Sequence, residues 1–157
     1  MKTKISIITI IIITLLYVNI VEAKEKKVLK NNLRNDLNGQ LLKAPNNNAI
    51  YWIDGGMRRH ITSPNVFNSI FAPKNVTNYP DISLIPTGKP ITGSNRLIRC
   101  NTPGAKFSGY VFFLDNGKKR HVISNRAFQR NSFNWSCIID YNDCAIISSI
   151  PTGSPIK

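Results

Sequence analysis

The segment DGGMRRHITS, residues 54–63, decides the fold because it recurs with few changes as DNGKKRHVIS at residues 115–124. In each copy an aromatic, β-branched run leads into Asp and small turn residues, and a basic run follows. This order predicts a hairpin of two antiparallel strands joined by a tight turn. The two histidines of the chain, His60 and His121, occupy the same place in the two copies.

The similarity extends beyond the hairpin on both sides. ISLIPTGKPI from Ile82 recurs as ISSIPTGSPI from Ile147. Upstream, QLLKAP from Gln40 and RLIRCN from Arg96 are each suited to a first short strand. The chain therefore contains two similar units, and a recurrence of this length is best interpreted as a repeated structural element.

A helix start follows each hairpin. Ser63 and Ser124 are suited to cap a short helix, and Pro64 occupies the favoured first helical position in the first copy. Each unit is then a set of short antiparallel strands with one short helix. Because units of roughly 55 to 65 residues bury little surface alone, we expect a β-rich α+β fold with both units packed as one domain.

The chain divides into four segments. Residues 1–23 combine two lysines, an apolar run and a small-residue site ending at Ala23, which indicates a secretory signal peptide. The length of that run also suits an uncleaved anchor. Residues 24–38 are a basic N-terminal arm, residues 39–93 the first unit and residues 94–157 the second unit.

The composition is strongly cationic. The chain has 21 Lys and Arg against 8 Asp and Glu, and removal of residues 1–23 leaves 19 against 7, a net charge of +12. A field of this sign favours anionic partners. For an exported, extracellular chain we expect an acidic glycan or another extracellular or cell-surface polyanion, with at most peripheral contact with a membrane.

The basic strand of each hairpin provides the candidate ligand contacts. Alternation along a strand turns at least one cation outward in each unit, where neighbouring aromatic rings could stack on sugars. The predicted ligand-binding residues are Arg58, Arg59, Lys118, Lys119, Arg120, Tyr51 and Trp52. The same cations could instead protect an exposed strand edge, and the aromatic residues also suit a core.

His60 and His121 raise an alternative, a small secreted hydrolase or nuclease in which two histidines act as acid and base. Asp54 and Asp115 are explained by the turns, and no catalytic or phosphate-binding motif occurs in the sequence. We therefore expect a protein that is not an enzyme and needs no cofactor. A further alternative is a cationic membrane-active or structural protein acting through residues 24–38, where leucines recur at helical spacing.

Three cysteines in an exported chain predict a disulfide. Cys137 and Cys144 are close together in CIIDYNDC and are the expected pair, and they lie where the second copy is longer by four residues. Cys100 is then a free buried thiol or a link between two chains in a dimer. No CxxC spacing or histidine cluster accompanies these cysteines, so we expect no metal site.

Two sequons fit an exported chain. NVT at Asn75 and NWS at Asn134 follow the predicted helices of the two units at similar places. Both asparagines are predicted glycosylation sites, which would place their loops on the surface.

The repeated pattern resembles a tandem repeat of secreted, mainly bacterial proteins. In that repeat an aromatic strand, a D-G-G or D-N-G turn, a K/R-R-x-I strand, an S-P-x-x-F helix start and an I-P-x-G segment recur. IYWIDGGMRRHITSPNVF and LIPTGKPIT carry the resemblance, which covers residues 38–157. The second copy departs from it at Asn125 and Ser149, where the first has Pro64 and Leu84. The resemblance implies attachment to a surface, and no activity is assigned to the repeat.

Overall fold

The computed structural model describes residues 7–73 and 76–157, which fall into two parts. The first part contains a single helix, α1 (Ile7–Asn31), and the second is a compact unit from Arg34 to Lys157. Among the described residues, no helix has both the length and the apolar composition that a membrane span requires.

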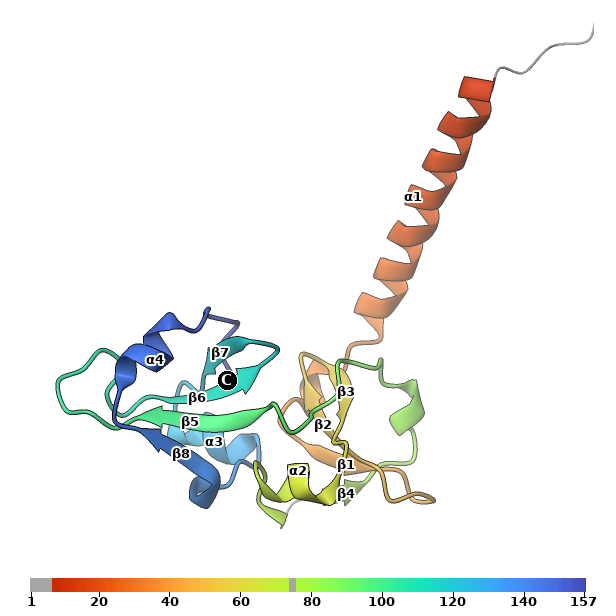
Figure 1. The fold of residues 1–157 in the computed structure, drawn as a ribbon. Helices are drawn as coiled ribbons and strands as arrows, with labels where there is room; N and C mark the ends of the chain where they lie inside the picture. The colour runs from red at the N-terminus through yellow and green to blue at the C-terminus, as the bar shows by residue number, and fades with distance from the viewer. Residues whose placement is uncertain (1–6, 74–75) are drawn as a thin grey trace, which may run out of the picture. The chain divides into compact units, whose positions relative to one another are not determined.

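The compact unit contains two four-stranded sheets with the same strand order (Figure 1). The first has the order β3-β2-β1-β4, with β1 (Leu41–Lys43), β2 (Ile50–Asp54), β3 (Met57–His60) and β4 (Val76–Asn78). The second has the order β7-β6-β5-β8, with β5 (Arg96–Cys100), β6 (Val111–Asp115), β7 (Lys118–His121) and β8 (Ile138–Tyr141). In each sheet three strands are antiparallel and the fourth runs parallel to the first. The predicted β-rich α+β class is confirmed.

The hairpin turns have the backbone geometry that their residues predict. Gly55 and Gly56 have φ of 59° and 73°, and Asn116 and Gly117 have φ of 50° and 72°. Two consecutive positive φ angles twist a two-residue turn in the direction that antiparallel strands need. The turns therefore fix the register of β2 with β3 and of β6 with β7.

Short helices follow the hairpins as predicted. The hydroxyl of Ser63 accepts a hydrogen bond from the Val66 amide at 3.3 Å, and that of Ser124 accepts one from the Ala127 amide at 3.1 Å. Among the described residues, the compact unit contains the helices α2 (Pro64–Asn68), α3 (Asn125–Arg130) and α4 (Cys144–Ser149), with 3₁₀ turns η1 (Asn35–Leu37), η3 (Ile82–Leu84) and η4 (Trp135–Cys137).

One hydrophobic core spans both repeated units, residues 39–93 and 94–157. Trp52 has no exposed surface, and its ring centroid lies 5.4 Å from that of Phe113 and 5.7 Å from that of Phe133. Phe71 and Phe133 also form a β-bridge between the units. Because these aromatic rings bury one another, the two units share their largest side chains and fold as one domain, as predicted.

The predicted basic arm, residues 24–38, does not behave as one segment. Its first part continues α1 as far as Asn31. Leu37 is buried against Leu42 and Ile53 on the outer face of the first sheet. The compact unit begins at Arg34, so Leu37 belongs to it, and burial of Leu37 favours this attachment.

The predicted Cys137–Cys144 disulfide is wrong. The structure joins Cys100 to Cys144, with 5.3 Å between their Cα atoms, and Cys137 is the free cysteine among the described residues. Cys137 and Cys144 lie at opposite ends of β8, and four extended residues span about 13 Å, beyond the reach of a disulfide. With its sulfur bonded to Cys144, Cys100 is neither a free thiol nor available to link two chains.

Candidate functional site

Four charged side chains form an arginine–aspartate cluster between the hairpins of the two units. Arg59 donates to both oxygens of Asp115, at 2.7 and 2.8 Å, and Arg120 donates to both oxygens of Asp54, at 2.6 and 2.9 Å. Each arginine also bonds the aspartate of its own hairpin. The four side chains are only 5% to 17% exposed.

This cluster corrects part of the predicted ligand site. Arg59 and Arg120 were expected to project toward a polyanion, but their guanidinium groups are already committed to carboxylates inside the protein. Such bidentate pairs satisfy a charge that would be costly to bury alone. Asp54 and Asp115 therefore have a second role besides the turns, because each forms an ion pair with the arginine of the other unit.

Two further predicted contacts are also buried. The Trp52 side chain lies in the shared core, and the Lys119 ammonium donates to the carbonyl oxygens of Ser148 and Ile150. Burial lowers the pKa of Lys119, with a smaller contribution from Lys106. Neither side chain can contact a large ligand, because both are at least 97% shielded from solvent.

Three of the predicted residues stay within reach of solvent. Lys118 is exposed, and Tyr51 and Arg58 are half-buried. The Arg58 guanidinium lies 5.4 Å from the centroid of the Tyr51 ring, a cation–π contact. Tyr51 and Arg58 belong to the first hairpin and Lys118 to the second.

We expect the arginine–aspartate cluster to make the free energy of unfolding depend on pH in the acidic range. Burial alone would raise the pKa of Asp115, but hydrogen bonds from Arg59 and Arg120 hold it below its usual value. A carboxyl with a lowered pKa in the folded state stabilises the fold above its unfolded pKa, about 3.9, and this contribution disappears as pH falls through the folded pKa. Urea unfolding at a series of pH values should show the free energy of unfolding dropping below about pH 4. A profile equally steep in an Asp115→Asn variant would show that other carboxyls cause the loss.

The two histidines do not form one catalytic centre. His60 lines a pocket of the first unit, and His121 lines a separate pocket of the second unit. Burial lowers the pKa of His121, which favours the neutral form of its ring. The residues that line these two pockets include no carboxylate.

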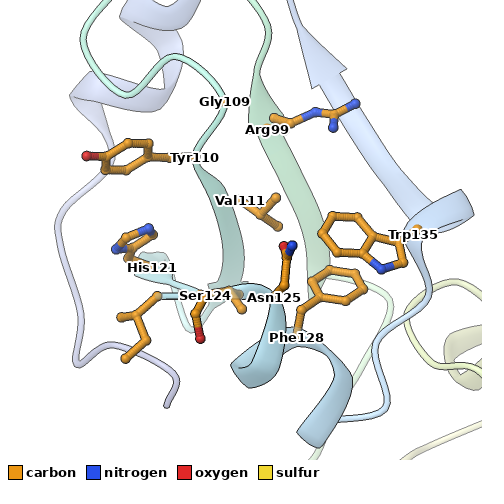
Figure 2. A pocket seen from close by; sticks show the side chains of 11 residues that line it. Arg99, Gly109, Tyr110, Val111, His121, Ser124, Asn125, Phe128 and Trp135 are labelled. Carbon is orange, nitrogen blue, oxygen red and sulfur yellow. The ribbon is translucent and has the colours of Figure 1, made fainter.

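A pocket of the second unit, called here the second-unit pocket, contains His121. It has a volume of about 480 Å³ and lies where β6, β7 and α3 meet the segment before β8. Figure 2 shows Tyr110 and His121 on one side of it and Phe128 and Trp135 on the other. Pockets with aromatic walls and a few polar groups are the usual form of a small-molecule site.

Each wall of this pocket is a pair of stacked rings. The centroids of Tyr110 and His121 are 4.7 Å apart with an interplanar angle of 11°, and those of Phe128 and Trp135 are 3.8 Å apart with an angle of 20°. Tyr110 and Trp135 are each 47% exposed, although apolar rings of this size are usually covered. Each stack therefore positions a ring that is still partly exposed to solvent.

Polar groups lie between these walls. Asn125 projects from the start of α3 between Tyr110 and Trp135 (Figure 2). Arg99 reaches the pocket from β5, but its guanidinium forms two hydrogen bonds with Asp140 on β8, at 2.7 and 2.9 Å. The pocket thus offers two ring faces, an amide and a cation whose charge is largely compensated.

Sequence reasoning missed this pocket. In the sequence Tyr110 stands in the aromatic run before the turn at Asp115, and Trp135 is the middle residue of the sequon at Asn134. One signal in the sequence distinguishes these rings, because both occur in the second unit alone. The first unit has Ala49 at the position of Tyr110, and Trp135 lies in the loop that is longer in the second unit. Asn125, already noted as a departure from Pro64, belongs to the same difference.

The structure describes one of the two predicted glycosylation sites. Asn75 lies outside the described residues. Asn134 is half-buried and caps η4, where its side-chain oxygen accepts a hydrogen bond from the Ser136 amide at 3.0 Å. Glycosylation at either residue stays a prediction.

Comparison of the chain with protein-family models, with curated proteins and with solved structures gives no match in any of the three. The chemistry of the site itself is therefore the basis for a function. Within the described part of the chain, no three His, Cys, Asp or Glu side chains come together in a way that could hold a metal ion. The second-unit pocket, with its ring faces and amide, is equipped for binding.

Proposed function

We propose that this protein is a secreted, non-enzymatic binding module that recognises an acidic glycan or a similar extracellular polyanion through the second-unit pocket. The observation that carries the proposal is the pair of half-exposed rings, Tyr110 and Trp135, held on opposite sides of one pocket. A sugar ring presents apolar C–H faces and polar edges, which match aromatic walls and the amide of Asn125.

Charge supports an acidic ligand. The chain has a formal net charge of +13, and the ion pairs of the described residues join aspartates to arginines. Because these aspartates are paired with arginines, exposed lysines such as Lys89, Lys106 and Lys118 make the surface potential positive. A positive field of this kind raises the rate at which anionic ligands are captured.

An extracellular location is supported by two features. The Cys100–Cys144 disulfide requires an oxidising compartment to form and persist. The apolar N-terminal run, a short basic start and a small-residue site at Ala23 fit an export signal. Both features agree with a ligand outside the cell.

Binding is favoured over the hydrolase alternative by the separation of His60 and His121. Acid–base cleavage would need both imidazoles, or one imidazole and a second titratable group, at a common reacting bond. Each histidine instead lines its own pocket, without a carboxylate beside it among the lining residues. His121 acts in this proposal as a neutral ring that supports Tyr110.

Replacing Trp135 with alanine is expected to weaken binding of an acidic polysaccharide at least about tenfold, because central aromatic contacts dominate most binding sites. Titration calorimetry with heparin and with polygalacturonate oligosaccharides, on the chain beginning at Lys24, would measure the change. Leu84→Ala is the matched control, since Leu84 is 73% exposed and lies on η3 of the first unit.

Two outcomes would contradict the proposal. One is unchanged affinity in both Trp135→Ala and Tyr110→Ala, which would place binding elsewhere. The other is absence of binding by the unaltered chain to every acidic polysaccharide tested. Circular dichroism of each variant would separate loss of a contact from loss of the fold, because Trp135 also stacks on Phe128.

A further inference from the structure

The first unit has a pocket of about 330 Å³ at the place equivalent to the second-unit pocket. The matching positions, 61 residues apart, include His60 with His121, Ser63 with Ser124 and Phe67 with Phe128. Equivalent strands and helices therefore build both pockets. We call this one the first-unit pocket.

The two pockets differ in what they offer. The first-unit pocket has Ala49 where the second has Tyr110, and Pro64 where the second has Asn125. It is smaller and more apolar, with aliphatic side chains such as Ile50 and Ile61 among its lining residues. It cannot hold a sugar ring between two aromatic walls in the same way.

A lysine is paired with a residue that lines the first-unit pocket, although it is not itself among the lining residues. Lys43 pairs directly with Ile50 across β1 and β2, and directly paired residues of antiparallel strands project on the same face. In the second unit, the side chain at the equivalent position reaches the pocket. There Arg99 pairs with Val111 in the same register, and both line the second-unit pocket.

The charge of this lysine is not compensated as that of Arg99 is. On the neighbouring parallel strand, Arg99 faces Asp140, whereas Lys43 faces Asn78. Among the described residues no carboxylate forms an ion pair with Lys43, which is half-exposed. The same position in the fold therefore carries a compensated cation in one unit and an available one in the other.

We infer that the first-unit pocket is a second binding site, selective for a carboxylate-bearing sugar such as a uronic acid. The apolar lining takes one face of the sugar, and the Lys43 ammonium binds its carboxylate. This inference rests on the proposed function and adds that the two pockets recognise different features of the ligand. The second-unit pocket recognises ring faces, and the first-unit pocket recognises charge.

The two histidines offer a direct test, since each lines one pocket and the chain has no others. Imidazole C–H resonances can be followed by NMR while a galacturonate hexasaccharide is added, and again with its carboxyl-reduced, neutral counterpart. In the unaltered chain the acidic hexasaccharide should shift both histidines, and the neutral one should shift His121 alone. In Trp135→Ala the acidic hexasaccharide should still shift His60.

Lys43→Gln is expected to weaken the response of His60 to the acidic hexasaccharide about fivefold and to leave that of His121 nearly unchanged. The matched control is Lys89→Gln, which removes an exposed cation of the same unit and should have a much smaller effect on His60. Equal effects of the two substitutions would overturn the role of Lys43, because a general charge effect would then explain them.

The outcomes separate the two proposals. A shift of His121 without any shift of His60 in the unaltered chain would overturn the second site and leave the proposed function standing. No shift of either histidine, with either hexasaccharide, would overturn both. A shift of His60 of equal size with the neutral hexasaccharide would show a second site without selectivity for carboxylate.

Discussion

Replacing Asp115 with alanine is expected to lower the free energy of unfolding by about 3 to 5 kcal/mol, the range measured when one partner of a buried ion pair is removed. Asp115 is 8% exposed and accepts hydrogen bonds from Arg59, Arg120 and Asn95. Its loss would leave the buried Arg59 with Asp54 as its only carboxylate partner, beside the carbonyl of Lys89. Urea unfolding followed by tryptophan fluorescence would measure the change, because Trp52 lies over Arg59.

Asp36→Ala is the matched control for this substitution. Asp36 also forms a two-bond pair with an arginine, Arg34, but both side chains are well exposed to solvent. An exposed pair contributes about 0 to 1 kcal/mol. If Asp115→Ala were no more destabilising than Asp36→Ala, the arginine–aspartate cluster would not be what holds the two hairpins together.

Removing the disulfide with Cys100→Ser and Cys144→Ser together is expected to destabilise the fold by about 4 kcal/mol, because the bridge closes a long loop and limits the unfolded chain. The two cysteines are 44 residues apart, and both are buried on the outer face of the second sheet. Thermal unfolding of the double variant and of the unaltered chain, with and without a reductant, would measure the difference.

Cys137→Ser provides the control. The Cys137 thiol donates to the Asn68 carbonyl at 3.1 Å, a bond that a serine hydroxyl can replace, and burial raises the pKa of this thiol. We therefore expect a change of less than about 1 kcal/mol. A loss of stability in Cys137→Ser as large as that in the double variant would support the Cys137–Cys144 pairing that the sequence suggests and the structure excludes, because each variant would then remove one cysteine of that bridge.

The hairpins and helix starts could be predicted because local chemistry determines them. Positive φ at Gly56 and Gly117 and the capping hydroxyls of Ser63 and Ser124 need no information from distant residues. The doubled pattern then implied two similar units. These features were enough to predict the fold class.

The fourth strand of each sheet could not be predicted in this way. β4 has the short polar sequence VTN, and β8 lies inside the segment between Cys137 and Cys144 that was treated as a loop. Both strands are stabilised by parallel pairing with a distant first strand, which leaves little local pattern. Missing β8 also led to the wrong disulfide, because the strand separates the two cysteines.

The candidate site was harder still to predict. Arg59 and Arg120 looked available because basic residues on a strand are usually solvated, and only the packing of the two units brings each one to the aspartate of the other hairpin. Likewise, Tyr110 and Trp135 are 25 residues apart and meet only through the path of β8 and η4. Sites assembled from distant segments depend on tertiary structure.

The reciprocity of the arginine–aspartate cluster has a consequence for assembly. Arg59 binds Asp115 as Arg120 binds Asp54, so residue i of one unit contacts residue j of the other and the reverse also holds. This is the defining property of an isologous interface between identical subunits. The chain thus contains the contact pattern of a twofold homodimer within one polypeptide. Because the two halves are covalently linked, their sequences can differ, and the first has Lys43 while the second has Tyr110 and Trp135.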